Sequence, residues 1–344
     1  MSQNILVVGG QGYIGSQTVL ALLENGFEVV SLDRLKSDYL TVGFEKAIYE
    51  YADLQDRTSL EKVFSKYIFD GVIHFAASIE VGESQLNPEK YYLNNVCGTL
   101  NLLAVMRQYD VNNIVFSSTA AVYGIPPTVP ILEDSQKLPI NVYGRTKWMM
   151  EQILSDYSTS YGLNQICLRY FNACGADLSQ RCGEAHEPES HLIPIVLQVA
   201  GGYREFLQVN GQDYLTDDGT CVRDFIHTLD LASAHVLALK KLLDTKITIS
   251  ESINLGTKNG YSINQVIEAA KKITGKDIPL KYGPRRIGDP DKLIADNSKA
   301  LKYLDWQPKY SDLETILDSA WKWYVQKGGA IGQQKAKEVL AQLV

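Results

Sequence analysis

Three glycines near the N-terminus constrain the fold of this 344-residue chain more than any other feature. Gly9, Gly12 and Gly15 form a G-x-x-G-x-x-G pattern, which follows a short apolar run at 5–8 and opens an amphipathic stretch at 13–24. Glycines at this spacing let the backbone approach a pyrophosphate, whose charge then lies at the positive N-terminus of the helix. The pattern therefore predicts a strand–turn–helix unit that binds a dinucleotide.

The N-terminal half alternates segments typical of strands and of helices. Strands are predicted at 5–8, 28–32, 48–51, 71–75, 113–118 and 167–170, and helices at 13–24, 59–66, 143–161 and in one long stretch after Pro88. Apolar strands alternating with helices indicate a parallel sheet covered on both faces, so the fold class is a Rossmann-type doubly wound α/β fold. We predict a nucleotide-binding domain at 1–171 and a smaller, mainly substrate-binding domain at 172–344, with a segment near 222–255 returning to the first domain.

The end of the second predicted strand indicates which dinucleotide is bound. Asp33 lies 18 residues beyond Gly15. A carboxylate at this place accepts hydrogen bonds from the ribose hydroxyls and repels a 2′-phosphate, which favours NAD over NADP. The neighbouring Arg34 leaves this choice less certain, because an arginine can accommodate the 2′-phosphate.

A tyrosine and a lysine in the predicted helix at 143–161 form a candidate acid/base pair. Tyr143 and Lys147 are four residues apart and share one helix face. A neighbouring cation lowers the pKa of a phenol, which would make Tyr143 usable as an acid/base at neutral pH. Thr119 follows a predicted strand, and its hydroxyl can bridge a substrate oxygen and the phenol, since ligands of open α/β sheets bind at the carboxyl ends of strands.

Composition excludes several classes of protein. The chain has 33 Lys and Arg against 40 Asp and Glu, a net charge of −7, and 45% hydrophobic residues. The acidic balance argues against binding to nucleic acid or to an anionic membrane. No apolar run approaches the roughly 18 residues of a membrane helix. The chain is therefore predicted to be a globular enzyme acting on a small molecule.

The cysteines predict a reducing compartment. The five thiols, an odd number with no C-x-x-C pair, indicate reduced cysteines of a cytoplasmic protein. Cys182, His186 and His191 match no common zinc spacing, so no metal site is predicted.

Further motifs resemble those of the UDP-glucose 4-epimerase family, in the extended branch of the short-chain dehydrogenases/reductases. The resemblance runs to about residue 325, and its motifs lie at 74–77, 81–84, 91–99, 168–172, 217–227 and 284–290. It implies an NAD-dependent isomerase acting on a UDP-sugar.

The resemblance also implies roles for individual residues. Those expected to bind NAD are Gly9, Gly12, Tyr13, Ile14, Gly15, Asp33, Asp53, Leu54, Phe75, Asn94, Lys147 and Tyr170. Those expected to bind the substrate are Thr119, Tyr143, Asn172, Leu192, Arg223, Arg286, Asp289 and Leu293, with Tyr143, Lys147 and Thr119 as the catalytic set. Guanidinium groups suit a diphosphate, although Arg223 beside Asp224 could instead form a structural ion pair. His227 is expected to be a packed loop histidine.

The implied reaction is transient oxidation at C4 of the sugar and its reduction from the other face, with Tyr143 exchanging the O4 proton. Thr119 is also typical of nucleotide-sugar 4,6-dehydratases, but these carry an Asp-Glu pair where this chain has Ala120 and Ala121. Ile79 and His191 stand where other members have Lys and Asn, and Leu293 leaves open whether 2-acetamido sugars fit.

Two alternatives stay open from the sequence. One is another NAD-dependent UDP-sugar epimerase or decarboxylase, acting on UDP-glucuronate or a pentose. The other is a non-catalytic NAD-binding regulator, which the presence of both Tyr143 and Lys147 argues against. The family usually dimerises through two helices per subunit, which implies a homodimer formed by helices at about 90–108 and 145–161.

Overall fold

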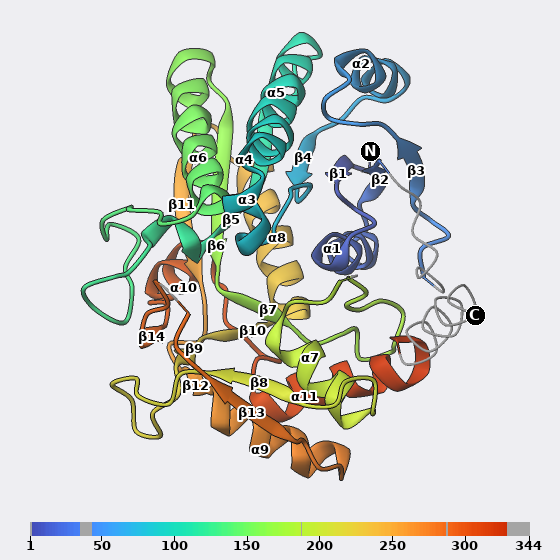
Figure 1. The fold of residues 1–344 in the computed structure, drawn as a ribbon. Coiled ribbons are helices and arrows are strands. Elements are labelled where there is room, and N and C mark those ends of the chain that lie inside the picture. Colours follow the sequence, from blue (N-terminus) through green and yellow to red (C-terminus); the bar gives the residue numbers. More distant parts are fainter. Residues whose placement is uncertain (1, 35–42, 187, 287, 329–344) are drawn as a thin grey trace.

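The centre of the protein is a parallel sheet of seven strands (Figure 1). The computed structural model describes residues 2–34, 43–186, 188–286 and 288–328. The strand order is β11-β6-β5-β4-β1-β2-β3. The strands are β1 (Asn4–Val8), β2 (Glu28–Asp33), β3 (Ile48–Tyr51), β4 (Gly71–His74), β5 (Asn113–Thr119), β6 (Asn164–Tyr170) and β11 (Ser250–Leu255).

Helices cover both faces of this sheet. On one face, Ile5 and Val7 pack with residues of α1 (Tyr13–Glu24) and α8 (Thr228–Leu243). On the other face, Leu6 and Val8 pack with residues of α2 (Arg57–Lys66), α5 (Gly98–Gln108) and α6 (Val142–Tyr161). Successive residues of a strand point to opposite faces, so the continuous apolar run of β1 serves two cores. The predicted doubly wound fold is confirmed.

The segment after Pro88 is one long helical stretch, as the sequence predicts, but it contains an irregular turn. It consists of α4 (Pro88–Tyr91), a π-helical turn η1 (Tyr92–Cys97) and α5, and it follows α3 (Val81–Leu86). The side chain of Asn95 lies within the π-helical turn and hydrogen-bonds Ser78 and Thr146. Such turns are frequent at functional sites. Here the irregularity joins the helix to the loop after β4.

The C-terminal elements build a second core. Residues of α7 (Leu192–Ala200), α9 (Ile263–Thr274) and α11 (Leu313–Trp323) form most of it. Ser262 caps α9 through a reciprocal bond pair with Gln265. The other elements are η2 (Ala120–Tyr123), β7 (Asn172–Cys174), β8 (Leu207–Asn210), β9 (Val222–Arg223), β10 (Phe225–His227), β12 (Tyr261–Ser262), β13 (Leu280–Gly283), β14 (Lys292–Leu293), α10 (Ser298–Leu304) and η3 (Tyr324–Gly328).

In Figure 1 the second core lies below the central sheet. Three small sheets connect its parts, with strand orders β10-β7, β12-β9-β14 and β13-β8. β11 pairs with β6 in the central sheet, whereas β9 and β10 belong to the small sheets. The exact domain boundaries near residues 171 and 222–255 stay a prediction. Among the described residues, no helix has the length and apolarity needed to cross a membrane.

Candidate active site

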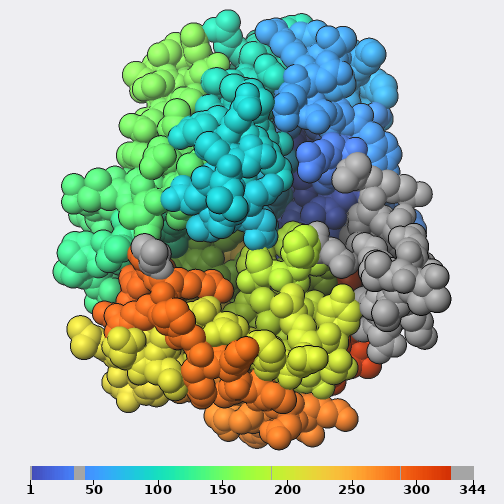
Figure 2. All heavy atoms as spheres, in the orientation of Figure 1, coloured from blue at the N-terminus to red at the C-terminus, as the bar shows by residue number. Residues whose placement is uncertain are grey.

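A large cavity lies between the two cores. It measures about 1490 Å³ and is lined by the turn after β1, the carboxyl ends of β2, β4, β5 and β6, the start of α6, and segments around α7, β8 and β14. Figure 2 shows the surface hollowed where the blue-to-cyan N-terminal part meets the yellow-green segment near residue 200. The cavity lies at the strand ends, where open α/β sheets bind ligands.

The glycine turn forms one end of the cavity. Gly9 adopts φ +82°, and a Cβ on it would lie 2.6 Å from the backbone nitrogen of Ala76. A Cβ on Gly15 would lie 2.1 Å from the carbonyl oxygen of Gly9. Gly12 precedes the first residue of α1, so the unpaired N–H groups of the first helical turn face this end. Only glycines fit such a turn, and the turn suits a pyrophosphate.

The carboxylate predicted to select the cofactor lies beside this turn. Asp33 ends β2, and its two carboxylate oxygens accept hydrogen bonds from the backbone N–H groups of Gln11 (3.3 Å) and Arg34 (2.8 Å). These contacts fix the carboxylate at the mouth of the glycine turn. Asp53 and Leu54, which follow β3, line the same end of the cavity.

The catalytic candidates meet in the middle of the cavity. Tyr143 lies in the first turn of α6, close to Thr119, the last residue of β5. The ammonium of Lys147, whose residue is 3% exposed, donates to the carbonyl oxygen of Ser117 at 2.8 Å. The hydroxyl of Ser117 also bonds the hydroxyl of Tyr170. The phenol, the amine and two hydroxyls are therefore held by one strand end and one helix face.

The charge states of this pair differ from the sequence expectation. Burial raises the pKa of Tyr143 to about 12, although the hydrogen bond from Thr119 lowers it. Burial lowers the pKa of Lys147 to about 7, against the electrostatic effects of Cys167 and Glu151. The expected lowering of the phenol pKa by a neighbouring cation is therefore wrong for the protein alone, because desolvation of the phenol sets the direction of the shift.

Charged side chains line the far end of the cavity. Arg223, in β9, forms an ion pair with Asp289, and the hydroxyl of Tyr214 lies 3.2 Å from the other oxygen of that carboxylate. Asp224 instead accepts hydrogen bonds from the backbone N–H groups of Thr257 and Ala295. The alternative of an Arg223–Asp224 ion pair is therefore wrong, since successive strand residues point to opposite sides.

All the residues that the sequence predicts for cofactor, substrate and catalysis line this one cavity. They come from segments up to 284 residues apart, between Gly9 and Leu293. Their individual roles stay predictions. His227 lies elsewhere: it is fully buried, caps α8 through the backbone N–H of Leu229 and contacts Ser319, as a packed loop histidine should.

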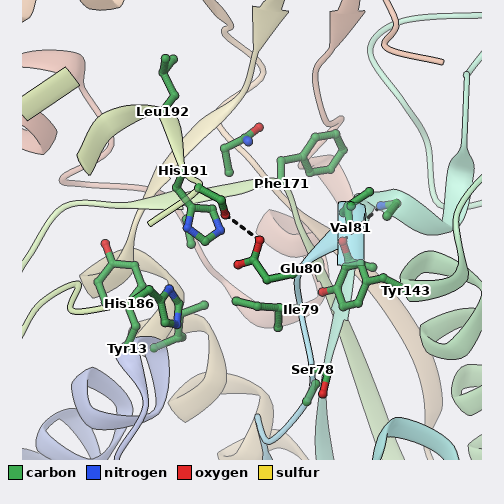
Figure 3. A pocket seen from close by; sticks show the side chains of 18 of the residues that line it. Tyr13, Ser78, Ile79, Glu80, Val81, Tyr143, Phe171, His186, His191 and Leu192 are labelled. Carbon is green, nitrogen blue, oxygen red and sulfur yellow. Dashed lines mark hydrogen bonds between the residues drawn. The ribbon is translucent and has the colours of Figure 1, made fainter. Parts of the chain in front are cut away.

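Sequence reasoning missed several lining residues. Phe206, Gln208 and Asn210 belong to or adjoin β8, which was not predicted. The sequence signal for β8 is an alternation of apolar and polar residues over four positions, in which Leu207 and Val209 are buried. Four positions are too few to predict a strand. Figure 3 shows another missed group: Glu80 lies near His186 and His191, and accepts a hydrogen bond from Ser190 at 2.7 Å.

Comparison with known proteins agrees with this arrangement. Residues 6–319 match a family model described as GDP-mannose 4,6 dehydratase. A UDP-glucose 4-epimerase of Halalkalibacterium halodurans is 50% identical over 320 residues, which are 93% of this chain and 95% of that protein. The chain belongs to the UDP-glucose 4-epimerase family. That family is part of the extended short-chain dehydrogenases/reductases.

Solved structures of UDP-glucose 4-epimerases extend the likeness to the fold. The enzyme of Brucella ovis, crystallised with NAD, is 44% identical with a TM-score of 0.89, and the alignment covers 93% of this chain and 98% of that one. The enzyme of Bifidobacterium longum, in complex with NAD⁺ and UDP, is 38% identical with a TM-score of 0.89, covering 95% and 99%.

The match to a dehydratase model does not conflict with membership of this family. The residues after Thr119 are Ala120 and Ala121, in the 3₁₀ turn η2. Their methyl groups carry no acid or base, so the position where a dehydratase would need proton transfer has none.

Proposed function

We propose that this chain catalyses the reversible 4-epimerisation of UDP-glucose and UDP-galactose, with NAD held in the cavity and Tyr143 as acid/base. The observation that carries the proposal is the placement of Tyr143, Thr119 and Lys147 between a glycine turn and a pair of arginines in one cavity. Relatives named UDP-glucose 4-epimerase support the same reaction.

The residues present fit NAD. The turn at Gly9 and Gly15 leaves room that a Cβ would fill, and the Asp33 carboxylate lies where ribose hydroxyls would donate to it. Bound there, NAD supplies the hydride acceptor and donor for C4 of the sugar. Tyr170 and Lys147 also line the cavity, away from the glycine turn. Both bond Ser117: the Tyr170 hydroxyl contacts its hydroxyl, and the Lys147 ammonium donates to its carbonyl oxygen.

Tyr143 exchanges the O4 proton. As phenolate it takes the proton when C4 is oxidised, and as phenol it returns the proton when C4 is reduced. Thr119 orients the reacting oxygen, because its hydroxyl lies close to the phenol. Lys147, when protonated, stabilises the phenolate one helical turn away. Arg223 and Arg286 hold the diphosphate while the oxidised sugar turns over.

The sugar specificity rests on the wall around β14. Leu293 ends β14 and lines the cavity. The side chain is intermediate in size, so acceptance of UDP-GlcNAc and UDP-GalNAc is a second outcome for the same assay. Another UDP-sugar epimerase or decarboxylase is the main alternative, and a non-catalytic NAD-binding regulator is the lesser one.

The experiment is proton NMR of the purified protein with UDP-galactose and, separately, with UDP-N-acetylgalactosamine, without added NAD. Conversion of UDP-galactose supports the proposal and shows that NAD is retained. Conversion of both substrates extends the specificity. No conversion of either, even after NAD is added, would leave only the alternatives.

Tyr143→Phe tests the acid/base role. General acid–base catalysis contributes about 10²–10⁴-fold, so kcat should fall by at least about 100-fold while NAD stays bound. Tyr123→Phe is a matched control, because it also removes one tyrosine hydroxyl, but from a residue outside the catalytic set. The Tyr123 hydroxyl is fully buried and bonds Asn254 and Arg169. Unchanged turnover in Tyr143→Phe would refute the assignment.

We further propose a cytoplasmic homodimer. The five cysteines are free thiols, in keeping with a reducing compartment. The predicted dimer helices correspond to the segment of η1 and α5 and to α6. Analytical ultracentrifugation of the purified protein tests the dimer.

A further inference from the structure

Four metal-ligating side chains gather in the wall of the cavity between β7 and α7. They are Glu184, His186, Glu189 and His191, and the ligand atoms that they offer all lie within 4.8 Å of one another. Figure 3 shows the rings of His186 and His191 on the same side of the cavity, close to Tyr13 and Glu80. The ring centroids are 5.6 Å apart. Four groups from an eight-residue stretch therefore converge on one point.

The immediate contacts pair each imidazole with a carboxylate. His186 Nδ1 lies 2.7 Å from Glu184 Oε1, and His191 Nδ1 lies 2.9 Å from Glu189 Oε1. Glu189 Oε1 is also fixed by the backbone N–H groups of Ser190 (2.8 Å) and His191 (2.7 Å). The backbone thus orients the second carboxylate toward the cluster.

One carboxylate oxygen is not satisfied by these contacts. Glu184 Oε1 is buried and has no hydrogen bond of proper geometry from the described residues, although His186 Nδ1 is close. A buried acceptor without an aligned donor is costly. With a divalent cation bound, two carboxylates and two neutral imidazoles would balance its charge.

The structure assigns a metal site to this cluster: we propose that Glu184, His186, Glu189 and His191 bind one divalent ion of the zinc type. Imidazole nitrogens and carboxylate oxygens are zinc ligands, and four protein ligands make a closed, structural site. Tetrahedral bonds of about 2.1 Å place the ligand atoms about 3.4 Å apart. The most separated of the four atoms, up to 4.8 Å apart, therefore need to approach by about 1.4 Å, within the reach of side-chain rotations.

A bound ion would restrain the segment that carries these four ligands, which forms part of the cavity wall. His191 directly precedes α7, and Ser190 bonds Glu80 across the cavity mouth. Glu184, His186 and His191 all line the cavity, next to Tyr13 of the glycine turn. Its role is structural and does not depend on the proposed epimerase reaction, so the two proposals can fail separately.

The competing explanation is two separate His–Glu ion pairs that bind no metal. The exposure of the five histidines allows a metal site to be distinguished from two ion pairs by experiment. The five histidines include three that are fully buried, His74, His227 and His235. The side chains of His186 and His191 are 37% and 41% exposed. A metal ion in solution can therefore reach the imidazoles of His186 and His191, but not those of the three buried histidines.

The test is titration of the nucleotide-bound, chelator-treated protein with Zn²⁺ by calorimetry and with Co²⁺ by visible absorption. We expect one ion per chain and the intense visible bands of tetrahedral Co²⁺, which Zn²⁺ abolishes. His186→Asn/His191→Asn should weaken binding by more than about tenfold, because it removes ligands outright. Glu184→Gln is a milder variant for the case that the double variant misfolds.

Two controls exclude adventitious binding. Cys97→Ser removes the exposed thiol, and Glu205→Gln removes an exposed carboxylate of the same cavity outside the cluster. Both should bind Zn²⁺ as the parent does. Hydrogen exchange of residues 183–192 should slow when Zn²⁺ is added. The proposal is overturned by a titration without a one-to-one transition, or by equal binding in the double histidine variant.

Discussion

Exchanging Glu151 for glutamine should destabilise this protein more than any surface charge change. Glu151 and Arg169 form an ion pair whose side chains are both 3% exposed. The carboxylate accepts from Arg169 Nε at 2.9 Å, from Ser118 and from Ser252 at 3.1 Å. A glutamine keeps the shape but loses the charge, and its amide group points donors at other donors. Arg169 is then a buried cation without a counter-charge.

The size of the effect follows from that burial. Removing one partner of a buried pair costs about 3–5 kcal/mol. With an unfolding entropy of about 2.1 cal/mol/K per residue, a chain of 344 residues should lose about 4–7 °C in thermal midpoint. The measurement is urea and thermal unfolding at one fixed NAD concentration, since bound ligand shifts both.

Two comparisons make the prediction refutable. Glu61→Gln breaks the exposed Arg57–Glu61 pair, with side chains 50% and 34% exposed, and should cost less than about 1 kcal/mol. Glu151→Met/Arg169→Met should cost less than the sum of its single variants, because neither charge is left alone. Strict additivity, or a Glu151→Gln effect no larger than that of Glu61→Gln, would refute the reasoning.

Two further predictions concern the cofactor turn and the active-site lysine. Gly15→Ala should abolish co-purification of NAD, measured by chromatography of the denatured protein, because its Cβ would lie 2.1 Å from the Gly9 oxygen. Gly26→Ala is the control: its Cβ meets nothing within 4 Å, so only the strain of φ +84° remains. Burial lowers the pKa of Lys147 to about 7, whereas the unfolded chain keeps about 10.4. The unfolded state then binds more protons from about pH 7 to 10, and the unfolding free energy of nucleotide-free protein should rise over that window. Lys147→Met should flatten the rise, and an identical rise in the variant would contradict this origin.

The parts of the fold that sequence predicted are those set by local patterns. The glycine spacing located the cofactor turn, because only glycine permits the approach of Gly15 to Gly9. Continuous apolar strands predicted the parallel sheet, since each strand serves both cores. The long helix after Pro88 is confirmed, but its π-helical turn was not predicted, because that turn depends on buried bonds of Asn95 to distant residues.

The parts of the site that were missed depend on tertiary contacts. The Arg223–Asp289 pair joins residues 66 apart, and no pattern around either residue indicates it. Glu184, His186, Glu189 and His191 lie in an irregular segment whose spacing matches no common motif, so only the folded backbone brings them together. The pKa directions of Tyr143 and Lys147 were likewise out of reach, because burial sets them.

The helix α6 shows how a buried ion pair can govern chemistry at the cavity surface. Tyr143, Lys147 and Glu151 recur at intervals of four on one helix face, from the partly exposed phenol to a lysine and a glutamate that are 3% and 4% exposed. Burial lowers the pKa of Lys147 to about 7, and the negative charge of Glu151 opposes this shift. Glu151 also holds Ser118, whose neighbours Ser117 and Thr119 contact Lys147 and Tyr143. A carboxylate that does not line the cavity therefore helps to set both the charge and the position of the groups that do.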